Sequence, residues 1–469
     1  MHCSNSLRKL PLPHPNALIP SRSASLSFIT STAIWLLLFT FFRHVYWRDP
    51  HSAFFDSTHV YEKDYSDRRQ SSGLSFLDGL VESNQTSFFS NSTSNLSGDS
   101  DGDGDTEVPD MCIAYVTIKR DMQDRNEGRQ YIDAALGTMI DGLSEEERKR
   151  VWISVLFADM DPSVHPLWEE EWLGRVVDDY GGYEVGGERR EWLEELMKQK
   201  EWQIKGVFDY VYALSRCYDT HAPYIAIMED DIVFAHDWFQ RTISALNKIE
   251  SLSQSPGDKF YNWIYLRLFY TETFQSWNEE VDFWYRHRYF LLFFAAPLFT
   301  ITALIFIRSK IGEKRKTGGW LNNWTIFVIG VVVVPAFIAL GFMVGKHNLP
   351  WWEFRGKDVV KMNSGGCCTQ AMVFPREQVE GLRIYLTGRG NGQTDLMIED
   401  YAENEGMERV ALGKQVVQGG GGFDEIFMRL ILCVGSRGDN QINAMSTWAF
   451  HFEEYDKVSM FGNSVYEES

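Results

Sequence analysis

Three consecutive carboxylates, Glu229, Asp230 and Asp231, directly follow a short apolar run at residues 224–228. In α/β sheets, ligands bind beyond the carboxyl ends of the strands. Carboxylates gathered there cannot all stay ionised without a cation, and oxygen ligands favour Mg²⁺ or Mn²⁺. The triplet therefore predicts a metal site, with Asp231 as a direct ligand and the other two positioning metal or ribose. The alternative reading is an acidic turn that opens a helix at 236–251.

Polar residues also end an earlier apolar run at residues 112–118. Thr117, Lys119 and Arg120 stand at the point where a uridine diphosphate would lie beside such a triplet. Isolated basic residues after a strand are usually only solvated. Together with the carboxylates, these three residues indicate a nucleotide-sugar site, in which a divalent metal bridges the diphosphate oxygens.

The elements that position these residues alternate along the chain. Apolar runs at 112–118, 151–157 and 224–228 read as buried strands, and helical periodicity fills the segments between them. A β-α-β-α-β order implies a parallel sheet with crossover helices. The sequence therefore predicts an α/β fold.

Three apolar segments, at residues 26–42, 289–307 and 324–344, are long enough to cross a hydrocarbon core of about 30 Å. The first has basic residues behind it and no cleavage site, so it reads as a signal-anchor; a cleaved signal peptide is the alternative. The positive-inside rule places the tail 1–25 and the basic loop 308–320 in the cytosol. The remaining parts are then luminal.

These features divide the chain into an ordered series of parts. We expect a cytosolic tail 1–25, an anchor 26–42, a flexible luminal stem 43–109, the first part of a catalytic domain 110–288, a membrane hairpin 289–344 and the second part of the domain 345–469. The stem is rich in Ser, Asn, Asp and Gly, which favours disorder. It carries three glycosylation sequons, at Asn84, Asn91 and Asn95, as expected of a luminal glycoprotein.

Composition limits the partners. The chain has 469 residues, with 45 Lys and Arg against 65 Asp and Glu, which gives a net charge of −20. Nucleic-acid binders need a basic surface, so this class is excluded. In the oxidising lumen, disulfides persist. The luminal cysteines Cys112, Cys217, Cys367 and Cys368 allow three pairings. Because a bond between the adjacent Cys367 and Cys368 strains the peptide, the favoured pairings are the two that bridge this pair to Cys112 and Cys217.

Five motifs make the chain resemble the glycosyltransferases of the N-acetylglucosaminyltransferase IV family, and more closely the Golgi GPI N-acetylgalactosamine transferases. They lie at residues 115–120, 224–232, 265–272, 367–375 and 394–398. A membrane hairpin that splits the transferase domain is the specific mark of the GPI enzymes.

The resemblance implies a GT-A-type fold that uses a UDP-sugar, expected to be UDP-GalNAc, with Mn²⁺ or Mg²⁺. It further implies transfer with inversion to mannose of a GPI-anchor glycan, on GPI-anchored proteins or glycolipid, at the luminal face of the Golgi membrane. Inversion needs one general base, and the family pattern maps it onto Asp395. From the residues alone, Asp395 reads as the N-cap of a helix at 396–405. The alternatives are an N-glycan-type N-acetylglucosaminyltransferase and an inactive transferase fold serving as a membrane scaffold.

The chain departs from the family pattern after Gln418. Where the family has a His that completes the metal site, this sequence has residues 419–433, which begin with four glycines. We expect this segment to be an insertion, of the kind that an unremoved intron produces, lying outside the transferase core. The metal site would then lack its imidazole.

Overall fold

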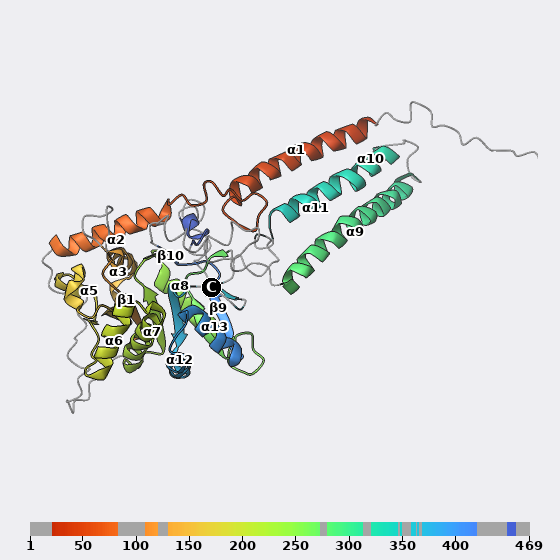
Figure 1. Ribbon diagram of the computed structural model, residues 1–469. Coiled ribbons are helices and arrows are strands. Elements are labelled where there is room, and N and C mark those ends of the chain that lie inside the picture. The colour runs from red at the N-terminus through yellow and green to blue at the C-terminus, as the bar shows by residue number, and fades with distance from the viewer. Residues whose placement is uncertain are drawn as a thin grey trace, which may run out of the picture. The chain divides into compact units, whose positions relative to one another are not determined.

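The computed structural model describes residues 21–82, 108–120, 130–272, 279–312, 320–345, 348, 358–362, 364, 368–419 and 448–455 (Figure 1). The chain divides into two compact units. The helical unit comprises Met1–Asp56 and Trp277–Leu349, and the sheet unit comprises Ser57–Ser276 and Pro350–Ser469. Each unit is described by itself below.

The helical unit contains three helices long and apolar enough to cross a membrane. These are α1 (Arg22–Val45), α9 (Glu279–Gly312) and a continuous segment of α10 (Asn323–Phe327), the π-helical turn η5 (Val328–Val333) and α11 (Val334–Met343). The π-helical turn precedes Pro335, which lacks the backbone N–H that a regular turn needs. The three apolar spans predicted from the sequence are therefore present as helices.

Small and polar residues hold these helices together. The indole Nε1 of Trp35 in α1 donates to the carbonyl oxygen of Ala336 in α11 at 3.0 Å. Near the other end of α1, Ser23 Oγ lies 2.9 Å from Thr325 Oγ1. Gly330 faces α9 so closely that a Cβ there would meet Ile301 at 2.2 Å. Close approach at small residues and hydrogen bonds between helices are the usual means of packing in a membrane.

The sheet unit is built on an eight-stranded sheet of order β3-β2-β1-β4-β8-β6-β9-β7. Its strands are β1 (Met111–Thr117), β2 (Val151–Phe157), β3 (Asp179–Gly181), β4 (Tyr224–Glu229), β6 (Trp263–Arg267), β7 (Val359–Lys361), β8 (Ala371–Pro375) and β9 (Glu408–Leu412). Strands β3, β2, β1 and β4 are mutually parallel, whereas β8 is antiparallel to both β4 and β6. The predicted α/β class and the parallel arrangement of β1, β2 and β4 are confirmed. A small second sheet pairs β5 (Ile232–Phe234) with β10 (Val417–Gly419).

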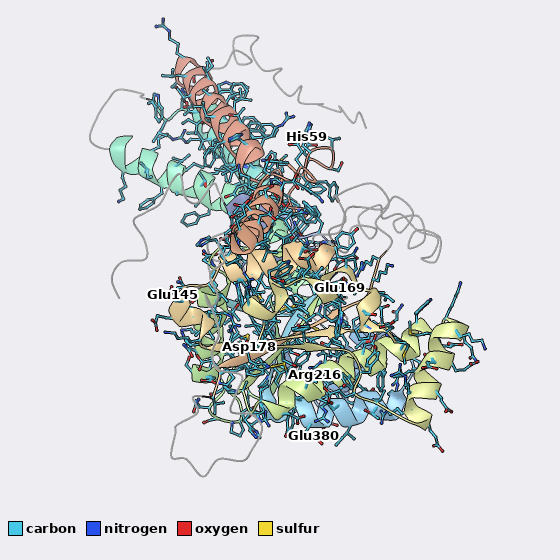
Figure 2. All side chains as sticks on the ribbon, turned by 90° about the vertical axis from the view of Figure 1, so that its left-hand side faces the viewer. His59, Glu145, Glu169, Asp178, Arg216 and Glu380 are labelled. Atoms are coloured by element: carbon cyan, nitrogen blue, oxygen red, sulfur yellow. A yellow bond between two sulfur atoms is a disulfide. The ribbon has the colours of Figure 1, made fainter. Side chains whose placement is uncertain are left out.

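Helices cover both faces of the large sheet (Figure 1). They are α3 (Tyr131–Asp141), α4 (Glu145–Arg148), α5 (Leu173–Val176), α6 (Glu188–Gln199), α7 (Trp202–Asp219), α8 (Trp238–Ser251), α12 (Arg376–Arg389) and α13 (Thr394–Asn404), with the short 3₁₀ turns η2 (Pro162–Val164), η3 (Pro166–Glu169) and η8 (Phe452–Glu454). Successive strand residues point to opposite faces. Ile113 of β1 accordingly joins a core with α3 and α8, and Ala114 joins one with α7, α12 and α13. Exposed carboxylates such as Glu145, Glu169 and Glu380 lie around the outside (Figure 2).

Part of the predicted flexible stem is ordered. Residues Tyr65–Glu82 form helix α2, which packs on α3. The contact is close because Gly73 meets Gly137, and Arg69 donates to the carbonyl oxygens of Thr138 and Phe234. The prediction of a flexible stem is therefore wrong for residues 65–82. The three sequons lie outside the described residues.

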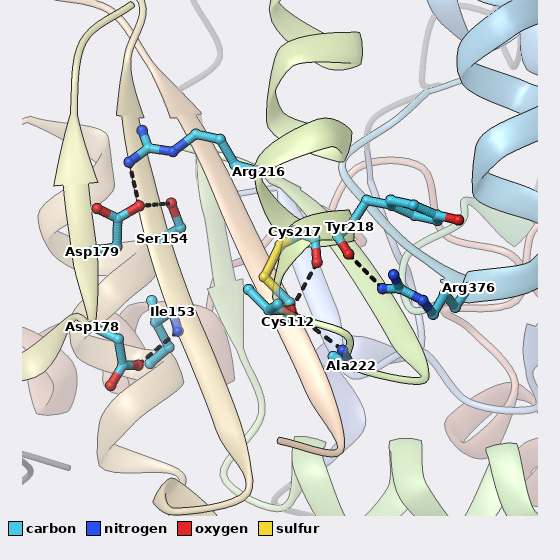
Figure 3. Close-up of a disulfide and its surroundings, with 11 residues drawn as sticks. Cys112, Ile153, Ser154, Asp178, Asp179, Arg216, Cys217, Tyr218, Ala222 and Arg376 are labelled. Carbon is cyan, nitrogen blue, oxygen red and sulfur yellow. Dashed lines mark hydrogen bonds and ion pairs between the residues drawn. A yellow bond between two sulfur atoms is a disulfide. The ribbon is translucent and has the colours of Figure 1, made fainter. Parts of the chain in front are cut away.

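The predicted disulfide pairing is also wrong. Cys112 of β1 is bonded to Cys217 of α7, with their Cα atoms 5.4 Å apart (Figure 3). Alternation along β1 turns Cys112 toward the face that α7 covers, where Cys217 is buried in the same core. Cys368 is disulfide-bonded as well, to a partner outside the described residues.

The C-terminal segment 448–455 closes one end of the sheet unit. The carboxylate of Glu272 accepts hydrogen bonds from the amides of Phe450 and His451. Gln418 of β10 exchanges two hydrogen bonds with the backbone of Ala449. Gly419, the first residue of the predicted insertion, belongs to β10, whereas residues 420–433 lie outside the described residues.

Candidate active site

The carboxylate triplet lies where the sequence places it, at the carboxyl end of a buried central strand. Strand β4 ends at Glu229 and runs parallel to β1, so the ends of both strands meet. Thr117 Oγ1 donates to Asp230 Oδ2 at 2.8 Å, and Arg120 Nη2 lies 2.5 Å from Asp230 Oδ1. The structure thus brings together three of the residues predicted to bind the nucleotide-sugar.

Lys119 lies slightly apart from this group. Its backbone N–H donates to Asp159 Oδ2 at 2.8 Å, which attaches the end of β1 to the segment that follows β2. Burial raises the pKa of Asp159, and the charges of Lys205 and Lys119 oppose that rise. Lys119 itself is exposed, at the edge of the site next to β2.

Glu229 is held by the segment that leads into β8. Thr369 Oγ1 donates to Glu229 Oε1 at 2.6 Å, and the Glu229 amide donates to the carbonyl oxygen of Gln370 at 3.0 Å. Burial raises the pKa of Glu229 to about 8, and the negative charge of Asp231 adds to the rise. In the absence of a cation, this carboxyl group is mostly protonated at neutral pH.

Asp230 and Asp231 complete the triplet. Burial raises the pKa of Asp230 to about 6, against the lowering effect of Arg120. Asp231 Oδ1 is buried and accepts no hydrogen bond within the described residues. The raised pKa values of Glu229 and Asp230 and the unpaired oxygen of Asp231 have one common explanation. A cation bound here would favour the ionised carboxylates and would pair with that oxygen. The donor set, oxygen alone, fits Mg²⁺ or Mn²⁺.

The protein supplies few ligands for such a metal. Among the described residues, no group of three or more His, Cys, Asp or Glu side chains is arranged to hold a metal ion by itself. Magnesium commonly binds through one or two carboxylates, with substrate phosphates and water filling the other positions. The site therefore fits a metal that is held jointly with a diphosphate.

Asp395 lies in the first turn of α13. The N-cap of this helix is Gln393, so the prediction that Asp395 caps a helix at 396–405 is wrong. Its Oδ2 accepts a hydrogen bond of 3.0 Å from the backbone N–H of Cys368, and its Oδ1 accepts one of 2.8 Å from Leu396. The carbonyl oxygen of Cys368 in turn accepts from Arg267 Nη1 at 2.8 Å.

Tyr210 of α7 relates Asp395 to the triplet. The phenol is buried beneath β4 and β8, and its hydroxyl lies 3.9 Å from the sulfur of Met372. Burial raises its pKa, and the negative charges of Glu229 and Asp395 contribute to the rise. The charges of the predicted base, in α13, and of Glu229, at the end of β4, therefore both raise the pKa of this phenol.

Sequence reasoning missed three residues at this site: His165, Thr369 and Gln370. His165 is buried, with its Nδ1 accepting from the Leu167 amide and its Nε2 lying 3.4 Å from Thr117 Oγ1. Burial lowers its pKa to about 4, so the ring is neutral. Two of these residues carry a signal in the sequence: Thr369 and Gln370 lie inside the motif at 367–375. Their place beside the triplet could not be predicted, because it depends on the long-range pairing of β8 with β4.

A family model described as GPI-N-acetylgalactosamine transferase PGAP4 matches residues 111–417. The chain belongs to this family. The match starts at the first residue of β1, includes Thr117, the triplet and Asp395, and ends in β10. Membership of the GPI-N-acetylgalactosamine transferase family makes the protein a glycosyltransferase that is connected with GPI, and the three apolar helices agree with a membrane protein. No curated protein matches the chain.

Proposed function

We propose that this protein transfers N-acetylgalactosamine, or a related hexose, from a UDP-sugar to a mannose of a GPI-anchor glycan. The reaction is metal-dependent and inverts the anomeric centre, and the sheet unit is of the GT-A type. The observation that carries this proposal is the buried Oδ1 of Asp231, which has no hydrogen-bond donor among the described residues. It lies beside carboxyl groups of raised pKa, within the range matched by the family.

The residues divide into three roles. Asp231 holds Mn²⁺ or Mg²⁺, and Glu229 and Asp230 position the metal or the ribose. Thr117, Lys119 and Arg120, at the end of β1, lie toward the nucleotide. A bound metal would neutralise charge that develops on the diphosphate leaving group.

Asp395 acts as the general base. It takes the proton of the acceptor hydroxyl while that oxygen attacks the anomeric carbon. The amides of Cys368 and Leu396 each donate to one of its oxygens, which fixes the plane of the carboxylate. Its second lone pair on either oxygen remains to accept a proton.

The membrane hairpin supports a lipid-linked acceptor. Helix α9 follows β6 in the chain and α11 precedes β7, so both halves of the sheet are tethered to the apolar helices. A tethered enzyme meets a membrane-bound acceptor at a raised effective concentration. We propose that the sheet unit is luminal, that the loop 308–320 is cytosolic and that the membrane is that of the Golgi.

The test is a transfer assay with the full chain in detergent or vesicles. UDP-GalNAc and Mn²⁺ are supplied with either a mannose-containing GPI glycolipid or a soluble N-glycan. We expect product from the glycolipid only, with a β-linkage from the α-linked donor, read by nuclear magnetic resonance. Transfer to the N-glycan alone, or no transfer to either acceptor, would overturn the proposal.

A further inference from the structure

The side-chain oxygen of Gln370, just before β8, has no hydrogen-bond partner among the described residues. The residue is 7% exposed, and its Oε1 is buried. Because an unsatisfied buried amide lowers stability, a ligand that supplied the missing partner would bind favourably here.

Strand pairing places Gln370 beside the triplet. Met228 of β4 lies opposite Ala371 of β8, and the next hydrogen bond of this ladder joins Glu229 to Gln370. Directly opposed residues of an antiparallel pair project to the same face of the sheet. Gln370 therefore lies on the face of Glu229.

Other groups of the site share this face. Met372, two residues along β8, contacts the hydroxyl of Tyr210, whose pKa responds to the charges of Glu229 and Asp395. Before Gln370 in the chain, the hydroxyl of Thr369 donates a hydrogen bond to Glu229, and the backbone N–H of Cys368 donates one to Asp395. Gln370 thus lies in the chain between residues that contact Glu229 and Asp395 and a residue that contacts Tyr210.

The chemistry of an amide selects among donor sugars. A glutamine offers one acceptor oxygen and an NH₂ donor, and an acetamido group offers the complementary N–H and C=O. Because the terminal amide can turn over, either orientation of the acetamido group can be matched. A hydroxyl at the same position of the sugar is shorter, and it does not extend as far toward the amide of Gln370.

We propose that Gln370 is a specificity-determining residue that recognises the 2-acetamido group of the donor sugar. This inference rests on the proposed function, since it needs a nucleotide-sugar at the triplet. It adds a residue that selects N-acetylgalactosamine over galactose, a choice that neither the triplet nor Asp395 explains.

The variant Gln370→Met tests this assignment, because methionine has nearly the same length and no amide. Binding of UDP-GalNAc, UDP-galactose and UDP in Mn²⁺ is measured by calorimetry. We expect the wild-type chain to prefer UDP-GalNAc. In the variant, its affinity should fall about tenfold, while the affinities for UDP-galactose and UDP stay unchanged. The thermal midpoint of the ligand-free variant should stay equal or rise, because an unsatisfied polar group is removed.

Gln415→Met is the matched control. Gln415 is also buried, and its Oε1 likewise has no hydrogen bond within the described residues, but its Nε2 donates to the Tyr270 carbonyl oxygen and to Glu272. Its substitution should lower the thermal midpoint and leave the donor preference intact. If the wild-type chain binds no UDP compound in Mn²⁺, the proposed function fails. If it binds them without preference, or if Gln370→Met changes all three affinities alike or none, the role of Gln370 is overturned and the proposed function stands.

Discussion

The backbone N–H of Cys368 donates a hydrogen bond of 3.0 Å to Oδ2 of Asp395. Cys368 adopts a positive φ of 80°, a conformation that is uncommon for a residue with a side chain. The next residue, Thr369, donates to Glu229. One short turn before β8 therefore holds both the predicted base and the carboxylate triplet, although these lie far apart in the sequence.

The Asp395→Asn variant should lose catalysis and keep its structure. Asparagine retains an oxygen that can accept from Cys368, but it cannot take a proton from the acceptor. We expect turnover to fall at least ~100-fold with little change in donor affinity. Asp400→Asn is the control on the same helix, because Asp400 is exposed and forms an exposed ion pair with Arg389 at 3.5 Å. If turnover of Asp395→Asn matched that of the control, Asp395 would have a structural role only.

The Asp231→Ala variant should abolish metal-dependent binding of UDP, measured by calorimetry with and without Mn²⁺. Its ligand-free stability should not fall, because Oδ1 of Asp231 is buried and accepts no hydrogen bond within the described residues. Asp237→Ala is the control. In the part of the chain that the structure describes, Asp237 Oδ1 is also buried without a partner, but its Oδ2 pairs with Arg241 at 2.5 Å. Wild-type binding of UDP in Mn²⁺ by Asp231→Ala would show that the triplet is a structural turn.

The raised pKa of Glu229 predicts how stability depends on pH. Its ordinary pKa is 4.5 and its value in the folded protein is about 8. The folded state therefore binds this proton more tightly, and the stability that it contributes is lost as the pH rises toward 8. Without metal, we expect the thermal midpoint to fall between pH 6.5 and 8.5 by about 5 °C more in the wild-type chain than in Glu229→Gln.

The same pH series of thermal midpoints is then measured with Mn²⁺ present. A bound cation replaces the proton, so it should suppress the excess fall of the wild-type chain at high pH. Glu229→Gln keeps an oxygen for the hydroxyl of Thr369, which limits other effects on the fold. Parallel curves for the two proteins in chelator would contradict the assignment of this titration to Glu229.

The sequence predicted those parts of the fold that depend on local pattern. Uninterrupted apolar runs and helical spacing located β1, β2 and β4, and the residues after β1 and β4 do meet, because parallel strands end at one edge of the sheet. Helix α2 was not predicted, because its many serines and charged residues give it the composition of a flexible stem. Its inner residues, such as Leu77 and Leu80, become informative only when α3 is there to cover them.

Long-range pairing was outside the reach of sequence reasoning. Strand β8 inserts between β4 and β6 although the hairpin separates it from both in the chain, and this insertion brings Thr369 to Glu229. The disulfide was predicted wrongly for the same reason. The spacing of the cysteines does not reveal that Cys112 and Cys217 face each other from β1 and α7.

Two glycines of α2 test whether this helix is part of the folded unit. A Cβ on Gly73 would meet the Thr138 amide nitrogen at 2.5 Å, whereas a Cβ on Gly79 would meet nothing within 4 Å. Gly73→Ala should lower the free energy of unfolding by about 1–3 kcal/mol, because backbone must move. Gly79→Ala should leave it unchanged or raise it by up to ~1 kcal/mol, because alanine favours the helix. Chemical denaturation measures both, and equal effects would mean that α2 does not pack on α3.

Glycosylation mapping tests the predicted membrane topology. The helices α9 and α10 enclose the basic loop 308–320, and the turn around residues 255–258 in the sheet unit is exposed. Because positive loops stay in the cytosol, an acceptor sequon engineered into the loop should remain unmodified, and the natural sequon at Asn323 should as well. A sequon engineered near residue 260 should be modified. Both engineered chains are compared by their shift in mobility before and after removal of N-glycans. Modification in the loop, with none near residue 260, would invert the topology and place the carboxylate triplet on the cytosolic side, away from a luminal GPI glycan.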